Sequence, residues 1–466
     1  MSSERSKVCR AVPLPREVCT ASPEELAACV AGRTGSFWLD SADSESGVRD
    51  WSYVGWQAER CVSWREGEGD HPLDRLRNEV GAQRAVRDVP ADAPTFCGGW
   101  FALLAYDLGR SIENLPDRAM PDLFFPELYL ARHPVLLAFS RSQGRWWVAG
   151  TVEADASADG SASQLIACAE RWLKGAPSGG GMQETRRSST SAAVGSNVTR
   201  EAYEEAVRRA LEYIAAGDIY QVNLSQRFAA DWHAPAFDLF RRLRQESPAR
   251  YGVYARLDEA RSICSISPEL FLRTRGRKVW TRPIKGTRRR GATVAEDEGL
   301  RRELARCTKE LAELNMIVDL ERNDLGRVCE FGSVRVDSDG EIEEHPTVFH
   351  RVASVSGRLR DNVDAADLLR ATFPGGSITG APKIRAMEII EELEPARRGP
   401  YCGSLGWIGM DGNVELNIAI RTALVDDQAG KAWYHAGSGI VADSQPAHEY
   451  EETLHKAAAF FRAVNP

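Results

Sequence analysis

The 466-residue chain lacks long apolar runs, an excess of basic residues and closely paired cysteines. Without ~20 consecutive apolar residues we expect no membrane-spanning helix, and residues 1–16 show no apolar core of a secretory signal. The net charge of −8 argues against nucleic acid or anionic membranes as partners, because both attract basic proteins. Ten cysteines without a Cys-x-x-Cys pair predict free thiols in a reducing cytoplasm.

Several common catalytic patterns are also missing. The eight histidines include no His-x-x-x-His spacing of the kind that holds a transition metal. No Ser-His-Asp order points to acyl transfer, and no Gly-x-Gly-x-x-Gly fingerprint points to a dinucleotide. These absences argue against zinc hydrolases, serine hydrolases and dinucleotide-binding oxidoreductases.

The patterns that are present predict strands mixed with amphipathic helices. Short apolar strings at 134–139 and 146–150 end in turn residues and predict strands. Residues 164–173 have helical spacing, and a second helix is predicted to begin after Thr199 as N-cap and to stop at Gly217. The composition is that of a globular protein, and these patterns fit an α+β fold of strands backed by helices.

A change in composition suggests how the chain is divided. Residues 175–197 are rich in Gly, Ser, Thr and Ala with few large apolar side chains, which is typical of a flexible linker. We therefore expect an N-terminal subdomain over 1–174 and a catalytic region over 198–466. Residues 219–225 alternate as a half-buried strand would, with Gln221 on one face.

A lysine between a proline and a glycine is the first candidate for chemistry. Residues 281–287 read Thr-Arg-Pro-Ile-Lys-Gly-Thr, and Pro283 and Gly286 predict a defined turn that presents Lys285 as a nucleophile. An amine attacks carbon only when neutral, so its pKa must fall below the usual ~10.4. The expected causes are burial and nearby arginines, and the plain alternative is a basic surface turn. The arginines are Arg282, Arg288, Arg289 and Arg290.

Three further motifs follow in order. They are Ile-Val-Asp-Leu-Glu-Arg-Asn-Asp-Leu-Gly at 317–326, Phe-Pro-Gly-Gly-Ser-Ile-Thr-Gly-Ala-Pro-Lys at 373–383, and Ala-Gly-Ser-Gly-Ile-Val-Ala-Asp-Ser at 436–444. Together with the lysine motif they resemble the chorismate-utilising enzymes over roughly residues 199–460. The resemblance implies an anthranilate synthase component I-like α/β sandwich. In that fold, two interleaved subdomains pack antiparallel sheets face to face, with helices outside.

The resemblance also implies a reaction. Lysine at position 285, where anthranilate synthases typically carry alanine, is similar to the aminodeoxychorismate synthases. Members that add water carry a lysine at the position of Gln221, and glutamine cannot deprotonate water. We therefore expect a transferase that aminates chorismate to 4-amino-4-deoxychorismate for p-aminobenzoate and folate synthesis. The alternatives are anthranilate synthase component I and a non-catalytic regulatory paralogue.

The resemblance assigns catalytic and metal-binding roles to specific carboxylates. It implies that Glu269 protonates the departing C4 hydroxyl, and that Glu313 and Glu452, helped by Glu449, bind Mg²⁺. Considered alone, Ser-Pro-Glu is a common helix start, and Glu452 with Lys456 is a common exposed i,i+4 pair.

The resemblance also implies a set of substrate contacts and a partner protein. Some of these residues also have simpler readings: Arg421 is a charge at a strand edge, His350 is structural, and Gly437 and Gly439 form a plain turn. Because no cysteine lies in a Gly-x-Cys-x-Gly elbow, we expect a separate glutamine amidotransferase to supply ammonia. The implied chorismate contacts are Gln221, His350, Thr379, Tyr401, Arg421, Gly437, Gly439 and Lys456.

Overall fold

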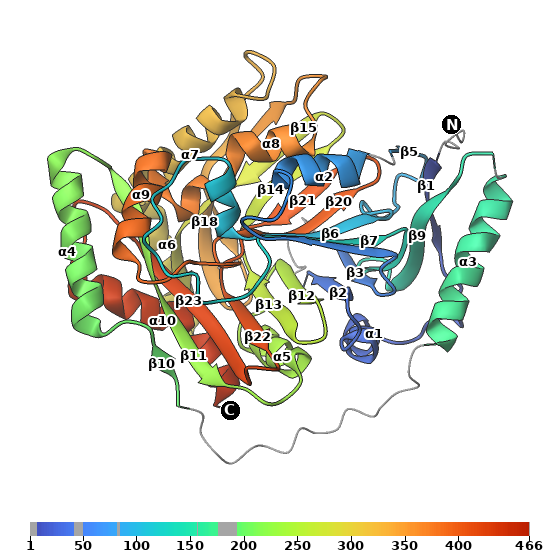
Figure 1. The fold of residues 1–466 in the computed structure, drawn as a ribbon, viewed down its shortest axis with the longest axis horizontal. Helices are drawn as coiled ribbons and strands as arrows, with labels where there is room; N and C mark the ends of the chain where they lie inside the picture. Colours follow the sequence, from blue (N-terminus) through green and yellow to red (C-terminus); the bar gives the residue numbers. More distant parts are fainter. Residues whose placement is uncertain (1–6, 42–49, 82–83, 156, 176–192, 466) are drawn as a thin grey trace.

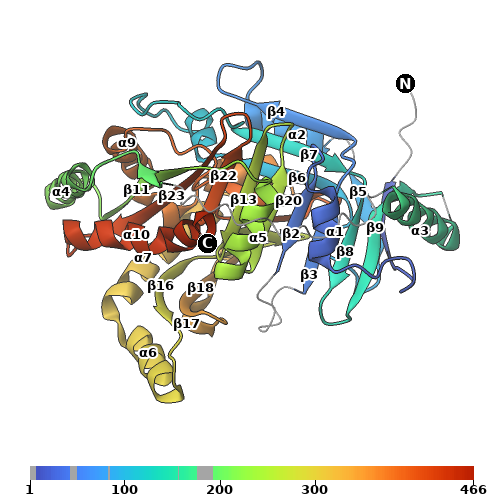
Figure 2. The ribbon, with the colours of Figure 1, turned by 90° about the horizontal axis from the view of Figure 1, so that it is seen from below.

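Two large sheets pack face to face with helices outside in the computed structural model, which describes residues 7–41, 50–81, 84–155, 157–175 and 193–465 (Figures 1 and 2). The first sheet runs in the order β10 (Gly195–Ser196), β11 (Gln221–Asp231), β23 (Lys431–Ile440), β22 (Thr422–Asp426), β13 (Arg261–Ser267), β12 (Tyr251–Arg256), β2 (Phe37–Asp40), β3 (Trp51–Gly55), β8 (Val135–Ser140), β9 (Arg145–Glu153), β1 (Lys7–Pro13) and β5 (Ala85–Arg87), with β19 (Gly380–Ala381) beside β11.

The second sheet runs in the order β16 (Ile284–Arg289), β18 (Val348–Arg358), β15 (Lys278–Arg282), β14 (Leu270–Arg275), β21 (Val414–Asn417), β20 (Ser404–Gly409), β6 (Gly99–Leu104), β7 (Leu128–His133) and β4 (Arg60–Trp64), with β17 (Arg335–Glu344) beside β18. The pairing in both sheets is antiparallel, apart from the parallel pair β1 and β5. Each sheet combines strands from before and after the predicted linker, so the two subdomains interleave as expected.

Helices cover the outer faces. Against the first sheet lie α1 (Pro23–Val30), α3 (Ala158–Lys174), α4 (Arg200–Ala216), α5 (Ala236–Glu246), α9 (Lys383–Leu393) and α10 (Pro446–Val464). Against the second lie α2 (Pro72–Gly81), α6 (Val294–Arg306), α7 (Thr308–Gly326) and α8 (Ala365–Thr372), together with the short 3₁₀ helices η1 (Tyr106–Ser111) and η2 (Gly376–Ile378). Figure 2 shows α6 at the outer end of this layer, beyond β16.

Apolar side chains fill the space between the sheets. Phe101 and Trp407 of the second sheet belong to one core with Phe37 and Ile263 of the first. Within it, Phe96 stacks on Trp407 with ring centroids 4.8 Å apart. Burial of apolar surface on both sides of each sheet explains why strands such as β6 and β20 read as continuous apolar runs rather than as alternating ones.

Most predicted elements are confirmed. The helix after Thr199 is α4, whose N-cap hydroxyl accepts a hydrogen bond from the Ala202 N–H and whose last turn ends at Gly217 with φ 83°. The strand at 219–225 corresponds to β11, but its residues are buried on both faces rather than half-buried. Of the predicted linker, residues 176–192 lie outside the described residues, and Gly195–Ser196 forms β10.

The ten cysteines are free thiols, as predicted. No helix within the described residues is long and apolar enough to cross a membrane.

Candidate active site

Lys285 lies in strand β16 rather than in the predicted turn. The pairing of β16 with β18 shifts between Ile284 and Thr287, and Gly286 at this irregularity has φ 89°. A Cβ on Gly286 would lie 2.9 Å from a carboxylate oxygen of Glu310, so glycine is needed both for the backbone angle and for space. The Lys285 Nζ donates a hydrogen bond to the carbonyl oxygen of Ser377, at 3.1 Å.

The charges around Lys285 differ from those that the sequence predicts. Burial lowers the pKa of Lys285; the carboxylate of Glu269 opposes this effect and the ammonium of Lys456 adds to it. The four arginines that were expected to lower the pKa of Lys285 each form an ion pair with a carboxylate instead. The pairs are Arg282 with Glu343, Arg288 with Glu303 and Glu310, Arg289 with Glu296, and Arg290 with Asp297.

Glu269 lies in the short connection between β13 and β14 and does not begin a helix. Its carboxyl is buried, with 4% of the residue exposed. Burial raises the pKa of Glu269, while the Ser377 hydroxyl and the Lys285 ammonium act in the opposite direction. A buried carboxyl with a raised pKa beside an amine with a lowered pKa is an arrangement suited to proton transfer.

A second buried carboxyl, Glu321, was not predicted as a functional residue. The Thr281 hydroxyl donates a hydrogen bond to it at 3.0 Å, and none of the described lysines or arginines lies within ion-pair distance. Burial, and then the charge of Glu269, raise the pKa of Glu321 well above its ordinary value. Burial therefore favours the protonated form of Glu321. It lies in the motif at 317–326, whose spacing alone does not show which side chains turn inward.

The predicted metal ligands come from two helices. Glu313 of α7 and Glu452 of α10 both interact electrostatically with Lys285. Burial is the largest cause of the raised pKa of Glu313; the ammonium groups of Lys285 and Lys309 oppose it, and the negative charge of Glu452 adds to it. Glu452 also forms the i,i+4 pair with Lys456 that the plainer reading predicts, at 2.7 Å, with 47% of its side chain exposed. Glu449, one turn earlier, is buried.

These glutamates offer part of a metal shell. No group of three His, Cys, Asp or Glu side chains within the described residues is arranged to hold a metal ion. Repulsion between two carboxylates is what a divalent cation relieves, and Mg²⁺ accepts an incomplete protein shell because it retains waters and takes oxygens from an anionic substrate. The donor set fits Mg²⁺ on these terms.

Gly437 and Gly439 lie in strand β23 and not in a turn. Gly437 pairs with Ser225 of β11, and Gly439 pairs with Asn223. The Ser225 N–H donates to Glu394 and the Asn223 N–H donates to the Thr379 carbonyl, so both N–H groups point away from β23. In an antiparallel ladder this places the N–H groups of both glycines on the side away from β11 as well. Strand β22 pairs with β23 only as far as Tyr434, so no described strand pairs with that side of the two glycines.

The Gln221 side chain lies next to these glycines. It is fully buried, and neither polar atom of its amide has a hydrogen-bond partner within the described part of the chain. A Cβ on Gly439 would lie 2.9 Å from the Gln221 Nε2 and 3.9 Å from the Lys285 Nζ. A buried amide without partners costs about 1–3 kcal/mol, and a bound ligand at this position would supply the missing hydrogen bonds.

The other predicted substrate contacts fall into two groups. Lys456 donates to the Gly437 carbonyl at 2.9 Å, and the Tyr401 hydroxyl lies 3.0 Å from the point that a Cβ on Gly437 would occupy, so both residues border the glycines. The Thr379 hydroxyl is instead directed to the Gly375 carbonyl, at 3.0 Å. Thr379 therefore supports its own loop.

Arg421 and His350 form the second group. They line one cavity of about 10 Å³, and Arg421 is not at the end of a strand but in the connection between β21 and β22, with φ 51°. The Thr287 hydroxyl lies 2.9 Å from the His350 Nδ1. Burial, and then the Arg421 guanidinium, lower the pKa of His350 well below its ordinary value. Among the described residues, neither side chain forms a hydrogen bond or ion pair with Lys285 or Glu269.

The comparisons with known proteins show the family of the chain. The family model described as chorismate binding enzyme matches residues 34–462. The chain belongs to this family. It is 41% identical to aminodeoxychorismate synthase component 1 of Bacillus subtilis, over 80% of this chain and 78% of that protein. It is also 42% identical to anthranilate synthase component 1 of Thermus thermophilus, over 92% of each chain.

A solved structure shows the same fold. Anthranilate synthase component I from Streptococcus pneumoniae superposes with a TM-score of 0.77 and 28% identity, covering 89% of this chain and 93% of its own. The predicted sandwich of antiparallel sheets is confirmed. The named relatives divide between two products at nearly equal identity, so family membership leaves the product to be argued from the site.

Proposed function

We propose that this member of the family converts chorismate and ammonia into 4-amino-4-deoxychorismate, with Lys285 as covalent nucleophile. The observation that carries the proposal is the position of Lys285. Its amine interacts electrostatically with the buried Glu269 and lies 3.9 Å from the point that a Cβ on Gly439 would occupy, and burial favours its neutral form. An alanine at this position could not form an adduct.

In the first step the Lys285 Nζ bonds to C2 of chorismate, the two ring double bonds shift, and the C4–O bond breaks. Glu269 gives its proton to the departing hydroxyl, which leaves as water, and then takes the extra proton from Nζ. In the second step ammonia bonds to C4, the double bonds return, and Glu269 returns the proton to Nζ as the C2–Nζ bond breaks. The product ammonium then reprotonates Glu269, so atoms and charge balance.

Binding contributions follow from the same site. The N–H groups of Gly437 and Gly439 and the ammonium of Lys456 suit one substrate carboxylate. Arg421 suits another anionic group, with His350 beside it. Glu313 and Glu452, with Glu449 nearby, would hold Mg²⁺, which when bound polarises anionic substrate oxygens and the leaving hydroxyl.

Anthranilate synthesis is the second candidate, because relatives that make anthranilate are as similar as those that make aminodeoxychorismate. A product assay separates the two. We expect purified chain given chorismate, Mg²⁺ and ammonium to form a product that keeps the enolpyruvyl ether and carries nitrogen on C4. Release of anthranilate and pyruvate would show the second activity, and no product at all would favour a non-catalytic paralogue.

We further propose that ammonia comes from a separate glutamine amidotransferase. No cysteine of the chain lies in a Gly-x-Cys-x-Gly elbow, and the relatives are named as component 1 of their synthases. We expect ammonium to support turnover by this chain alone, and glutamine to support it only after a glutaminase subunit is added. Glutamine-dependent turnover by a homogeneous preparation of this chain would contradict the proposal.

A further inference from the structure

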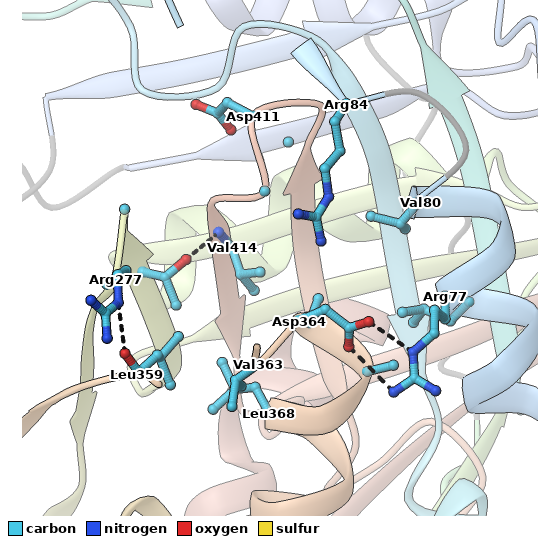
Figure 3. A pocket seen from close by; sticks show the side chains of 18 of the residues that line it. Arg77, Val80, Arg84, Arg277, Leu359, Val363, Asp364, Leu368, Asp411 and Val414 are labelled. Carbon is cyan, nitrogen blue, oxygen red and sulfur yellow. Dashed lines mark hydrogen bonds and ion pairs between the residues drawn. The ribbon is translucent and has the colours of Figure 1, made fainter. Parts of the chain in front are cut away.

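A cavity of about 240 Å³ lies apart from the candidate active site, between helices α2 and α8 (Figure 3). The turn between β14 and β15 and the turn between β20 and β21 complete its wall. Its floor is apolar and consists of the buried side chains of Leu76, Leu359, Leu368 and Val414. None of the residues assigned to the reaction lines it.

Most charges on the wall of this cavity are already paired. Arg77 pairs with Asp364 at 2.7 Å, Arg277 pairs with Asp361 at 2.8 Å, and Asp411 accepts from Arg87 outside the cavity at 3.3 Å. Such pairs leave no excess of either charge on this part of the wall.

Arg84 is different. Figure 3 shows its guanidinium directed into the cavity, and no carboxylate of the described residues lies within ion-pair distance of it. Within the described part of the chain, the side chain of Arg360, also on the wall, donates to a backbone carbonyl at 2.7 Å and pairs with no carboxylate. The cavity therefore combines an apolar floor with spare positive charge, which is a complement to a small molecule with an apolar body and one negative group.

We propose that this cavity binds a small cyclic carboxylate, with its ring on the apolar floor and its carboxylate on the Arg84 guanidinium. A carboxylate is preferred over a bare inorganic anion, because an inorganic ion would leave the apolar floor in contact with water. A neutral ring would leave the exposed Arg84 guanidinium hydrated and would gain nothing from its charge.

Helix α8 connects this cavity to the catalytic lysine. Immediately before its first residue, the N-cap Asp364 accepts hydrogen bonds from Arg77 on the cavity wall. At its last residue, the Thr372 carbonyl accepts from Lys383, at 2.9 Å, and the chain then continues to Ser377, whose carbonyl holds the Lys285 Nζ. An occupant that moves α8 therefore changes the surroundings of Lys285. This coupling does not depend on which product the enzyme makes.

The binding test uses benzoate and 4-aminobenzoate as probes in calorimetric titrations of the full chain. We expect both to bind, aniline and inorganic phosphate to bind at least about tenfold more weakly, and Arg84→Gln to weaken benzoate by about tenfold, the scale of one charge-assisted hydrogen bond. Arg84→Lys should keep part of the affinity. Arg16→Gln, which changes an exposed arginine elsewhere, should keep all of it.

Benzoate could also enter the candidate active site, and Lys456→Ala separates the two locations. Binding that survives Lys456→Ala and falls with Arg84→Gln supports the cavity. Binding that falls with Lys456→Ala and survives Arg84→Gln overturns the proposal, as does the absence of binding to the parent chain. For the coupling, we expect saturating benzoate to change the rate at which Lys285 is chemically labelled in the parent and not in Arg84→Gln. Binding without such a change would refute the route through α8.

Discussion

Glu269→Gln should change the reactivity of Lys285 and the turnover rate in opposite directions. The negative charge of Glu269 raises the pKa of Lys285, against the larger effect of burial. Lys285 and Glu269 exchange a proton in the proposed reaction, and the charged pair, with the proton on Lys285, is the unreactive form. Glutamine keeps the size of the side chain and cannot become a carboxylate, so this form loses its stabilising charge and more of the amine should be neutral at neutral pH. An electrophile such as acetic anhydride should therefore label Lys285 faster in the variant.

Turnover should nevertheless be lost. An amide cannot donate the proton that the departing C4 hydroxyl needs, and a positioned general acid contributes about 10²–10⁴-fold in rate. Labelling is followed by mass spectrometry of the peptide that contains Lys285, and turnover is followed by loss of chorismate. If Glu269 served only to hold Lys285 charged, both rates would rise together.

Glu321→Gln is the matched control. Glu321 is buried and burial raises its pKa, which favours the protonated form, and glutamine resembles that form in size and charge. We expect turnover and labelling within about threefold of the parent, the scale of a small rearrangement. If Glu269→Gln lowers turnover by less than tenfold, or if Lys285 is labelled more slowly in that variant, the assignment of Glu269 as the acid is refuted.

Three other changes test neighbouring parts of the account. Gly439→Ala places a methyl group 2.9 Å from the buried glutamine amide, and we expect a higher KM for chorismate with an unchanged melting temperature; a normal KM would move the substrate away from β23. Arg398→Met removes the partner of Glu394, at 2.6 Å, where both residues are almost fully buried. It should cost about 3–5 kcal/mol in urea unfolding, and Arg398→Met combined with Glu394→Met should recover part of the loss, whereas additive losses would deny the pairing. Glu313→Gln and Glu452→Gln each remove one negative charge from the proposed ion site, so activity should need more Mg²⁺; loss of activity at an unchanged Mg²⁺ requirement would place these glutamates elsewhere.

The fold could be predicted because local and family signals agree. The Thr199 cap and the Gly217 stop frame α4 as expected, since both depend on neighbouring residues only. The position of Lys285 in a strand could not be read in the same way. Pro283 and Gly286 are typical of a turn, and the pairing that makes the segment a strand comes from β18, more than sixty residues further along the chain.

The electrostatics of the site were the least predictable part. The arginines next to Lys285 in sequence are neutralised by carboxylates of α6, α7 and β17, while its nearby cation, Lys456, comes from α10. Likewise, nothing in the spacing of Glu321 shows that it is buried against Thr281. Charge balance in a buried site depends on tertiary contacts, so the sequence suggests candidate reacting groups and not their surroundings.

A covalent adduct on Lys285 is the central claim, and mass spectrometry of the quenched enzyme tests it most directly. Chain mixed with chorismate and Mg²⁺ in the absence of ammonia should gain the mass of chorismate less one water, on the peptide that contains Lys285. Ammonium added before the quench should remove this mass, and Lys285→Ala should never acquire it. An adduct on any other residue, or turnover of chorismate with unmodified Lys285 at every time point, would contradict the account.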